Sequence, residues 1–288
     1  MSLLKKYQTD PKNLLNTALS MFKSRKIKTA IVEGVCDKRF LSQWIDNGLN
    51  IRFDGLDGKW LVEKTFESSK LKPYCDYDFL YFCADVDFDV VAKKQLHSNQ
   101  KFVYNSFCFD EGKLFYNDLE AYLINTRAFE KVLVNLDVDT SEADKIRSRL
   151  ERASRFVGSL RAADIIVQRD NHLSKSVLNG FEVRGFFDPN SISVDEAEVY
   201  EALPRWSNHP LYVEDLIAEA KRLDREYPAP WSLSRGHDVT EMLAMYFERS
   251  KHKGMTSDRI ELMLRLACEF SEFIQSPMGR KFSAMGMI

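Results

Sequence analysis

Residues 79–89 read Phe-Leu-Tyr-Phe-Cys-Ala-Asp-Val-Asp-Phe-Asp, and residues 30–40 read Ala-Ile-Val-Glu-Gly-Val-Cys-Asp-Lys-Arg-Phe. Each stretch is a short apolar run that ends in carboxylates, which is typical of a buried parallel strand. Open α/β sheets bind their ligands outside the carboxyl ends of the strands. If these two strands are neighbours, Glu33, Asp85 and Asp87 meet at one edge, where they repel each other unless a hard cation such as Mg²⁺ joins them. The two stretches therefore predict a parallel sheet with a metal site at its edge.

The segments around these strands alternate between strand and helix patterns. Strands are predicted over 28–33, 49–53, 77–84 and 101–109, with helices over about 11–22, 37–45 and 59–70. This alternation favours a parallel sheet with helices on its faces. From about residue 136 the pattern is mostly helical, with candidates around 146–160, 210–226, 237–250 and 257–275 and a short extended excursion over 180–188. We therefore predict an α/β protein with a sheet domain over 1–135 and a helical domain over 136–288.

Composition limits the class of protein. The chain has 288 residues, of which 44% are hydrophobic and 29% charged, with a net charge of −2. Bulk charge therefore does not make it a polyanion binder, and any nucleic-acid contact must come from local patches. Five cysteines without a Cys-x-x-Cys pair favour a reduced protein without structural zinc. With neither a signal-peptide pattern nor a membrane-length apolar run, we expect a cytoplasmic protein that does not contact membranes. The absence of a Walker pattern argues against nucleotide hydrolysis by this chain itself.

The combination of Glu33-Gly34 after the first strand and Asp85-Val86-Asp87 after the third resembles the toprim domain of topoisomerases, primases and certain nucleases. Segments 33–40, 117–123 and 236–238 are similar to those of the toprim nuclease subunit of PARIS phage-defence systems. The chain is too short for the accessory domains of a primase or topoisomerase. The resemblance implies a toprim-like sheet domain that binds Mg²⁺ or Mn²⁺, followed by a helical domain for dimerisation and substrate positioning.

The same resemblance implies a toxic effector of antiviral defence. Such an effector is held inactive by an ABC-like, AAA-type ATPase partner, is released on infection, and cleaves tRNA as a homodimer. A DNA endonuclease of the same type stays open, because metal-dependent hydrolysis needs no 2′-hydroxyl. Two other classes also stay open: an aspartyl-phosphate phosphotransferase that uses Asp85 and Asp87, and a non-catalytic module that holds a structural cation.

Site roles follow from the resemblance and from position in the chain. The expected catalytic residues are Glu33, Asp85, Asp87, Lys38 and His237, and the expected metal ligands are Glu33, Asp85, Asp87 and Glu120. Lys38 lies one turn into the helix after Glu33, where it could face a phosphate. For Lys38 and Glu120 a solvated helix position is the competing interpretation. For His237 the competing interpretation is a structural role near a helix start.

Basic residues recur at helical spacing in the second half of the chain. Lys145, Arg149, Arg152 and Arg155 follow the apolar stripe at an offset. Such a ridge can track a phosphate backbone or can simply be a solvated helix face. The cluster at 23–28 has the same two interpretations.

Overall fold

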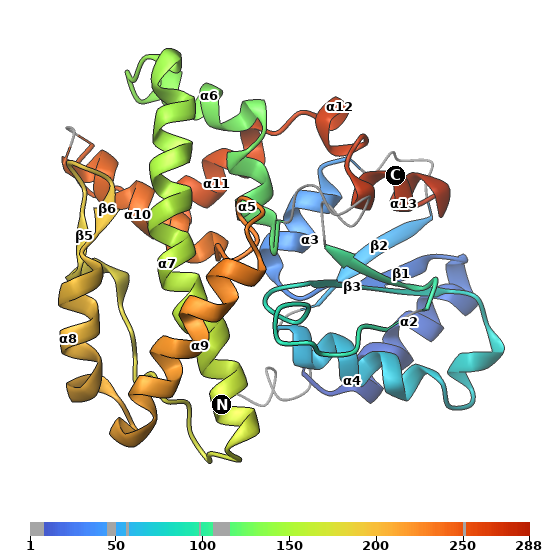
Figure 1. The fold of residues 1–288 in the computed structure, drawn as a ribbon. Helices are drawn as coiled ribbons and strands as arrows, with labels where there is room; N and C mark the ends of the chain where they lie inside the picture. Colours follow the sequence, from blue (N-terminus) through green and yellow to red (C-terminus); the bar gives the residue numbers. More distant parts are fainter. Residues whose placement is uncertain (1–8, 45–49, 56–57, 98, 106–115, 250–251) are drawn as a thin grey trace. The chain divides into compact units, whose positions relative to one another are not determined.

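The computed structural model describes residues 9–44, 50–55, 58–97, 99–105, 116–249 and 252–288 (Figure 1). The chain divides into two compact units: a sheet unit of residues 1–86, 97–106 and 270–288, and a helical unit of residues 87–96 and 107–269. These units do not follow a single boundary near residue 136. The chain enters the helical unit directly after the third strand, and its last residues return to the sheet unit.

The sheet unit is built on four parallel strands. They are β1 (Lys28–Ile31), β2 (Ile51–Asp54), β3 (Leu80–Asp85) and β4 (Phe102–Asn105), in the order β2-β1-β3-β4. The predicted α/β class with a parallel sheet is thereby confirmed. Residue 49 and residues 106–109 of the expected strands lie outside the described residues. Since β2 and β3 lie on opposite sides of β1, the chain changes direction across the sheet between β1 and β3, which is where such sheets place their ligands.

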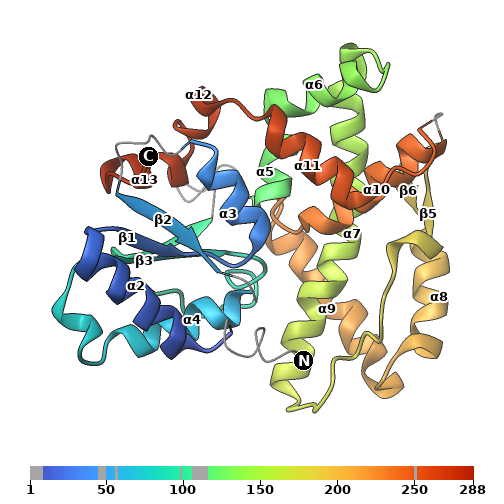
Figure 2. The ribbon, with the colours of Figure 1, turned by 180° about the vertical axis from the view of Figure 1, so that it is seen from behind.

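Helices cover both faces of this sheet. On one face lie α2 (Pro11–Arg25) and α4 (Lys59–Ser69); on the other lie α3 (Val35–Ser42), α12 (Phe270–Phe273) and α13 (Pro277–Ala284) (Figures 1 and 2). The start of α2 follows its sequence, with Pro11 in the first turn and Asp10 accepting the Lys12 N–H at 2.9 Å.

Aromatic side chains bring the C-terminal helices into the sheet unit. The ring of Phe273 lies 5.4 Å from that of Phe40 on α3, and the ring of Phe282 lies 6.2 Å from that of Phe53 on β2. All four side chains are at most 2% exposed, so they form part of one core. Burying four phenylalanines stabilises this arrangement by several kcal/mol, at roughly 1.5–3 kcal/mol each.

The helical unit contains seven α-helices and one short hairpin among its described residues. They are α5 (Leu119–Ile124), α6 (Arg127–Asn135), α7 (Ala143–Asp170), α8 (Glu196–Trp206), α9 (Val213–Glu226), α10 (Gly236–Arg249), α11 (Ser257–Ala267), β5 (Phe187–Asp188) and β6 (Ser193–Val194). The helix expected over 257–275 is interrupted at Cys268, so that its second part becomes α12. The 28-residue α7 is the central element, because α9, α10 and α6 all pack on it. Within the described segments, no helix combines the length and apolarity needed to cross a bilayer.

Candidate active site

The sheet unit brings Glu33 and Asp85 together. Glu33 follows β1 and Asp85 ends β3, and these strands pair with Ile31 opposite Phe82. The Asp85 backbone N–H donates a hydrogen bond of 2.7 Å to Glu33 Oε1. Both side chains are half-buried, so the carboxylates are partly open to solvent at the carboxyl edge of the sheet.

A glycine-containing loop holds the Glu33 turn in place. The backbone oxygen of Glu33 accepts a hydrogen bond of 2.9 Å from the Gly58 N–H. At Gly55 the backbone has φ +153°, and a Cβ atom there would lie 1.8 Å from the Val32 oxygen. Only glycine allows this close approach. The loop after β2 therefore fixes the backbone from which Glu33 projects.

The helix after Glu33 begins two residues before residue 37, the start expected from the sequence. It starts at Val35, and the Asp37 carboxylate reaches back to accept the Gly34 N–H at 3.0 Å. Asp37 therefore stabilises the helix start from inside the first turn, where a negative charge also interacts favourably with the helix dipole.

Lys38 contacts an acid, Asp54, that is not among the predicted site residues. Its ammonium nitrogen lies 3.8 Å from Asp54 Oδ1, and its side chain is 43% exposed. Asp54 ends β2, pairs in register with Ile31 of β1, and forms an ion pair with Arg52. An acid at the end of a strand next to β1 is the same pattern that identified Glu33, so the sequence did carry this signal. The geometry places Lys38 beside the β2 end of the sheet edge.

Asp87 is the first residue of the helical unit. Its backbone N–H donates to the Asn117 oxygen at 2.9 Å, and its φ of +49° is left-handed. Aspartate tolerates this conformation better than most residues. Asp89, the third acid of the run, lies 3.3 Å from the Lys94 ammonium. This hydrogen bond fixes the backbone of Asp87 to the chain just before α5.

Asp118 joins segment 117–123 to segment 236–238. Its Oδ1 accepts the Ala121 N–H at 2.9 Å and caps α5, while its Oδ2 accepts the Gly236 N–H at 2.6 Å at the start of α10. A Cβ atom on Gly236 would lie 2.3 Å from Asp118 Oδ1, so this contact needs glycine. Burial, with a smaller contribution from the nearby Asp87 carboxylate, raises the pKa of Asp118 to about 6, although the two N–H donors act in the opposite direction.

His237 is held as a cation by buried acids. Its Nδ1 lies 2.9 Å from Glu261 Oε1, and this hydrogen bond, with the charges of Glu120, Glu261 and Asp118, raises the pKa of His237 to about 9. The histidine side chain is 61% exposed, whereas that of Glu261 is only 6% exposed. At neutral pH the exposed imidazolium is suited to contact an anion or donate a proton, and unsuited to act as a general base.

The surroundings of Glu120 favour a structural role over metal binding. Its carboxylate is 8% exposed and lies 3.6 Å from the Arg265 guanidinium, which also lies 3.5 Å from Glu261. A buried guanidinium between two carboxylates neutralises part of their charge. Glu261 and Arg265 were not among the residues predicted from the sequence, although their spacing of four residues on one helix was a signal for a shared face.

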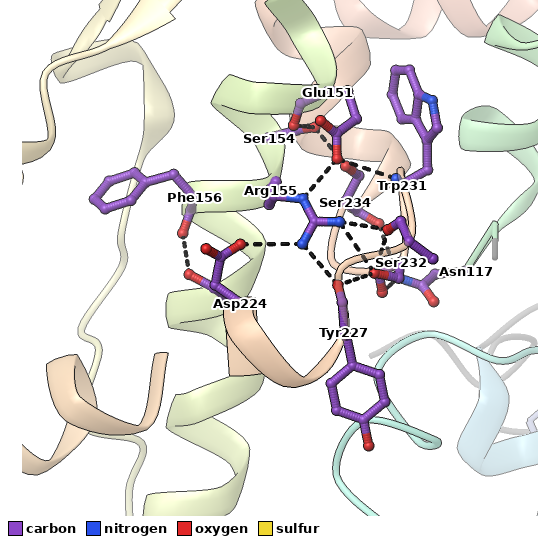
Figure 3. Close-up of polar contacts among 12 residues, drawn as sticks. Asn117, Glu151, Ser154, Arg155, Phe156, Asp224, Tyr227, Trp231, Ser232 and Ser234 are labelled. Atoms are coloured by element: carbon purple, nitrogen blue, oxygen red, sulfur yellow. Dashed lines mark hydrogen bonds and ion pairs between the residues drawn. The ribbon is translucent and has the colours of Figure 1, made fainter. Parts of the chain in front are cut away.

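A polar network centred on Arg155 supports the segment that contacts Asp87. Asn117 Nδ2 donates to the oxygens of Ser232 and Ser234, at 2.9 and 3.1 Å. The Arg155 guanidinium donates to the oxygens of Tyr227 and Ala229, at 2.8 and 2.5 Å, in the same loop (Figure 3). Arg155, one of the predicted basic-ridge residues, is therefore a partly buried structural hub.

The rest of that ridge has a different environment. Arg149 and Arg152 are exposed, and Lys145 forms a surface ion pair with Glu142 at 2.7 Å. For these three side chains, both interpretations of the ridge still apply: contact with a phosphate backbone and a solvated helix face.

The oxygen donors of Glu33 and Asp85 fit a hard divalent cation, because Mg²⁺ in proteins is bound through one or two carboxylates with water completing its shell. Across the described ranges, no group of three histidine, cysteine, aspartate or glutamate side chains is arranged as a ready metal cage. No protein-family model matches the sequence, and no curated protein matches it.

Proposed function

We propose that this chain is a metal-dependent endonuclease of the toprim type. The observation that carries the proposal is the pairing of Glu33 with the end of β3, where its carboxylate accepts the Asp85 N–H at the carboxyl edge of two adjacent parallel strands. A Glu-Gly after β1 and an Asp-x-Asp after β3 form the pattern that resembles toprim nucleases. The aspartyl-phosphate alternative needs its acidic pair after the first strand of the fold, whereas Asp85 ends β3.

Glu33, Asp85 and Asp87 would hold Mg²⁺ or Mn²⁺. When bound, such a cation polarises a phosphoryl oxygen and lowers the pKa of a bound water. The chain's own groups have separate tasks. The hydrogen bond from Asp85 fixes the Glu33 carboxylate, and Lys38 supplies a positive charge beside Asp54. The His237 imidazolium supplies a proton donor for a phosphate or a leaving oxygen.

The resemblance extends the proposal to substrate, partner and setting. We expect tRNA as the substrate, a homodimer as the active form, and an ABC-like, AAA-type ATPase as the partner that holds the nuclease inactive before phage infection. The alternative is a DNA endonuclease with the same site. The residues at the sheet edge do not distinguish these substrates, so the test must read both.

The test compares wild type with Glu33→Gln after expression in cells. Ends of cellular RNA and DNA are sequenced, with and without the ATPase partner. We expect cut ends that fall by about 100-fold or more in Glu33→Gln and, with the purified protein, are lost in EDTA and restored by Mg²⁺. The matched control is Glu67→Gln, because Glu67 is an exposed acid of the sheet unit that pairs only with Lys70 among the contacts described. Cutting by Glu33→Gln at the wild-type level would refute the proposed site.

A further inference from the structure

Many basic side chains of the helical unit are paired with a neighbouring acid. Arg147 lies 2.6 Å from Glu130, for example, and Arg161 lies 2.8 Å from Asp238. Four exposed basic side chains on α7 and α9 differ, because they form no ion pair and no side-chain hydrogen bond with any described residue. They are Arg149, Arg152, Lys221 and Arg225.

These four side chains line one concave surface, where α7, α8 and α9 meet (Figure 1). Arg152, Lys221 and Arg225 line a cavity of about 480 Å³, and Arg149 and Arg152 line a second cavity of about 170 Å³. Arg152 and Glu196 contribute to both cavities, which therefore adjoin. We call this surface, with its four cations, the basic groove.

The basic groove carries an excess of positive charge that the chain as a whole lacks. Of the described acids that line it, Asp224 is paired with Arg155 at 3.1 Å (Figure 3), which leaves Glu196 to oppose four cations. The net charge of the whole chain is −2. A local cationic surface on such a chain is the pattern expected of a site for a polyanion. Three of the four cations are arginines, whose planar guanidinium groups match the oxygens of a phosphate.

Tyr200 of α8 adds a neutral donor to the basic groove. Its ring packs edge to face against that of Phe156 on α7, with the ring centroids 5.4 Å apart, so the position of the side chain is fixed. Its hydroxyl forms no hydrogen bond within the part of the chain that the structure describes. Tyrosine hydroxyls, arginines and lysines are among the groups with which proteins contact the phosphates and sugars of nucleic acids.

We propose that the basic groove binds the phosphate backbone of a single-stranded segment of nucleic acid. Its larger cavity has the volume of a small-ligand site, which admits one nucleotide at a time and excludes a duplex. Because the contacts are to phosphates, binding depends on neither the base sequence nor the 2′-hydroxyl. The assignment of this strand to the substrate rests on the proposed nuclease function, whereas the binding itself is tested without cleavage.

The test uses Glu33→Gln protein in EDTA, so that neither cleavage nor metal enters the measurement. Fluorescence anisotropy follows a labelled strand of about 12 nucleotides, as RNA and as DNA, over a series of salt concentrations. Each phosphate contact contributes about 0.7 to the salt slope of single-strand binding, so Arg152→Gln combined with Arg225→Gln should lower the slope by about 1.4 and the affinity by roughly 25-fold at about 0.1 M salt. The control combines Arg184→Gln with Arg205→Gln, which removes two exposed arginines of the same unit that are already paired with acids, and it should change neither quantity.

All these arginines are exposed, so each variant should keep the melting temperature of the parent protein. An unchanged slope and affinity in the groove variant, or an equal loss in the control, would overturn the proposal. Polyglutamate of matched charge that binds as tightly as the strand would also overturn it, and would assign the groove to an acidic protein. A mononucleotide that binds as tightly as the strand would overturn it in favour of a nucleotide pocket. Strand binding that requires the groove, without cleavage of RNA or DNA by wild type, would refute the nuclease function and leave this assignment standing.

Discussion

Replacing Arg155 by alanine should destabilise the helical unit by about 3 kcal/mol. Its side chain is 15% exposed and donates hydrogen bonds to Glu151, Asp224, Tyr227 and Ala229. Removing one partner of a buried ion pair costs about 3–5 kcal/mol. We take the lower end, because Glu151 and the loop carbonyls are partly open to water, which replaces some of the lost hydrogen bonds.

Urea denaturation followed by circular dichroism measures this loss. With a slope of about 2 kcal/mol per molar, the midpoint of the transition that includes the helical unit should fall by about 1.5 M. Native-state hydrogen exchange should localise the effect, with faster exchange over residues 227–236 than elsewhere. Arg152→Ala is the matched control, since Arg152 is an exposed arginine on the same helix, and its change should stay within about 0.5 kcal/mol. An Arg155→Ala midpoint equal to that of the control would refute the hub assignment.

Two further predictions concern the glycine loop and the histidine pair. Gly55→Ala should destabilise the sheet unit by at least about 2 kcal/mol in urea unfolding, because the new Cβ would meet the Val32 oxygen. The control is Gly180→Ala, which has open space around it and should lower the free energy of unfolding by only about 1 kcal/mol. Equal losses of unfolding free energy in the two variants would contradict the proposed clash at Gly55. Since the pKa of His237 is raised from 6.5 to about 9, the stability from its pair with Glu261 is fully present below pH 6.5 and is lost as the pH rises through 9. His237→Asn should therefore flatten the fall in melting temperature between pH 6.5 and 9.5, and an unchanged slope would refute the pairing.

The sequence predicted the sheet well because strand ends carry local signals. The apolar runs before Glu33 and Asp85 identified two strands, and β1 and β3 are indeed neighbours, with a hydrogen bond between these two residues. The start of α3 was placed late, because Asp37 can cap a helix either as the residue before it or from inside its first turn. Local sequence does not separate these two geometries.

The hydrogen-bond network around Arg155 and Asn117 in the helical unit could not be predicted from the sequence. Arg155 meets Tyr227 and Asn117 meets Ser234 over separations of 72 and 117 residues, and these contacts exist only after the helices pack. At sequence level Arg155 looks like any charge on a solvated helix face. Likewise, the aromatic residues of 270–282 have a helical pattern that does not reveal which unit they join.

The return of the last helices to the sheet has a consequence for synthesis on the ribosome. Phe273 and Phe282 emerge only after residues 107–269 have been made, which takes on the order of ten seconds at roughly 5–20 residues per second. During that time Phe40 and Phe53 lack their partners, so the sheet unit that holds Glu33 cannot complete its core. The nascent chain therefore passes through a period in which exposed aromatic side chains invite chaperone binding, and the proposed nuclease site reaches its final rigidity only after α12 and α13 have been made.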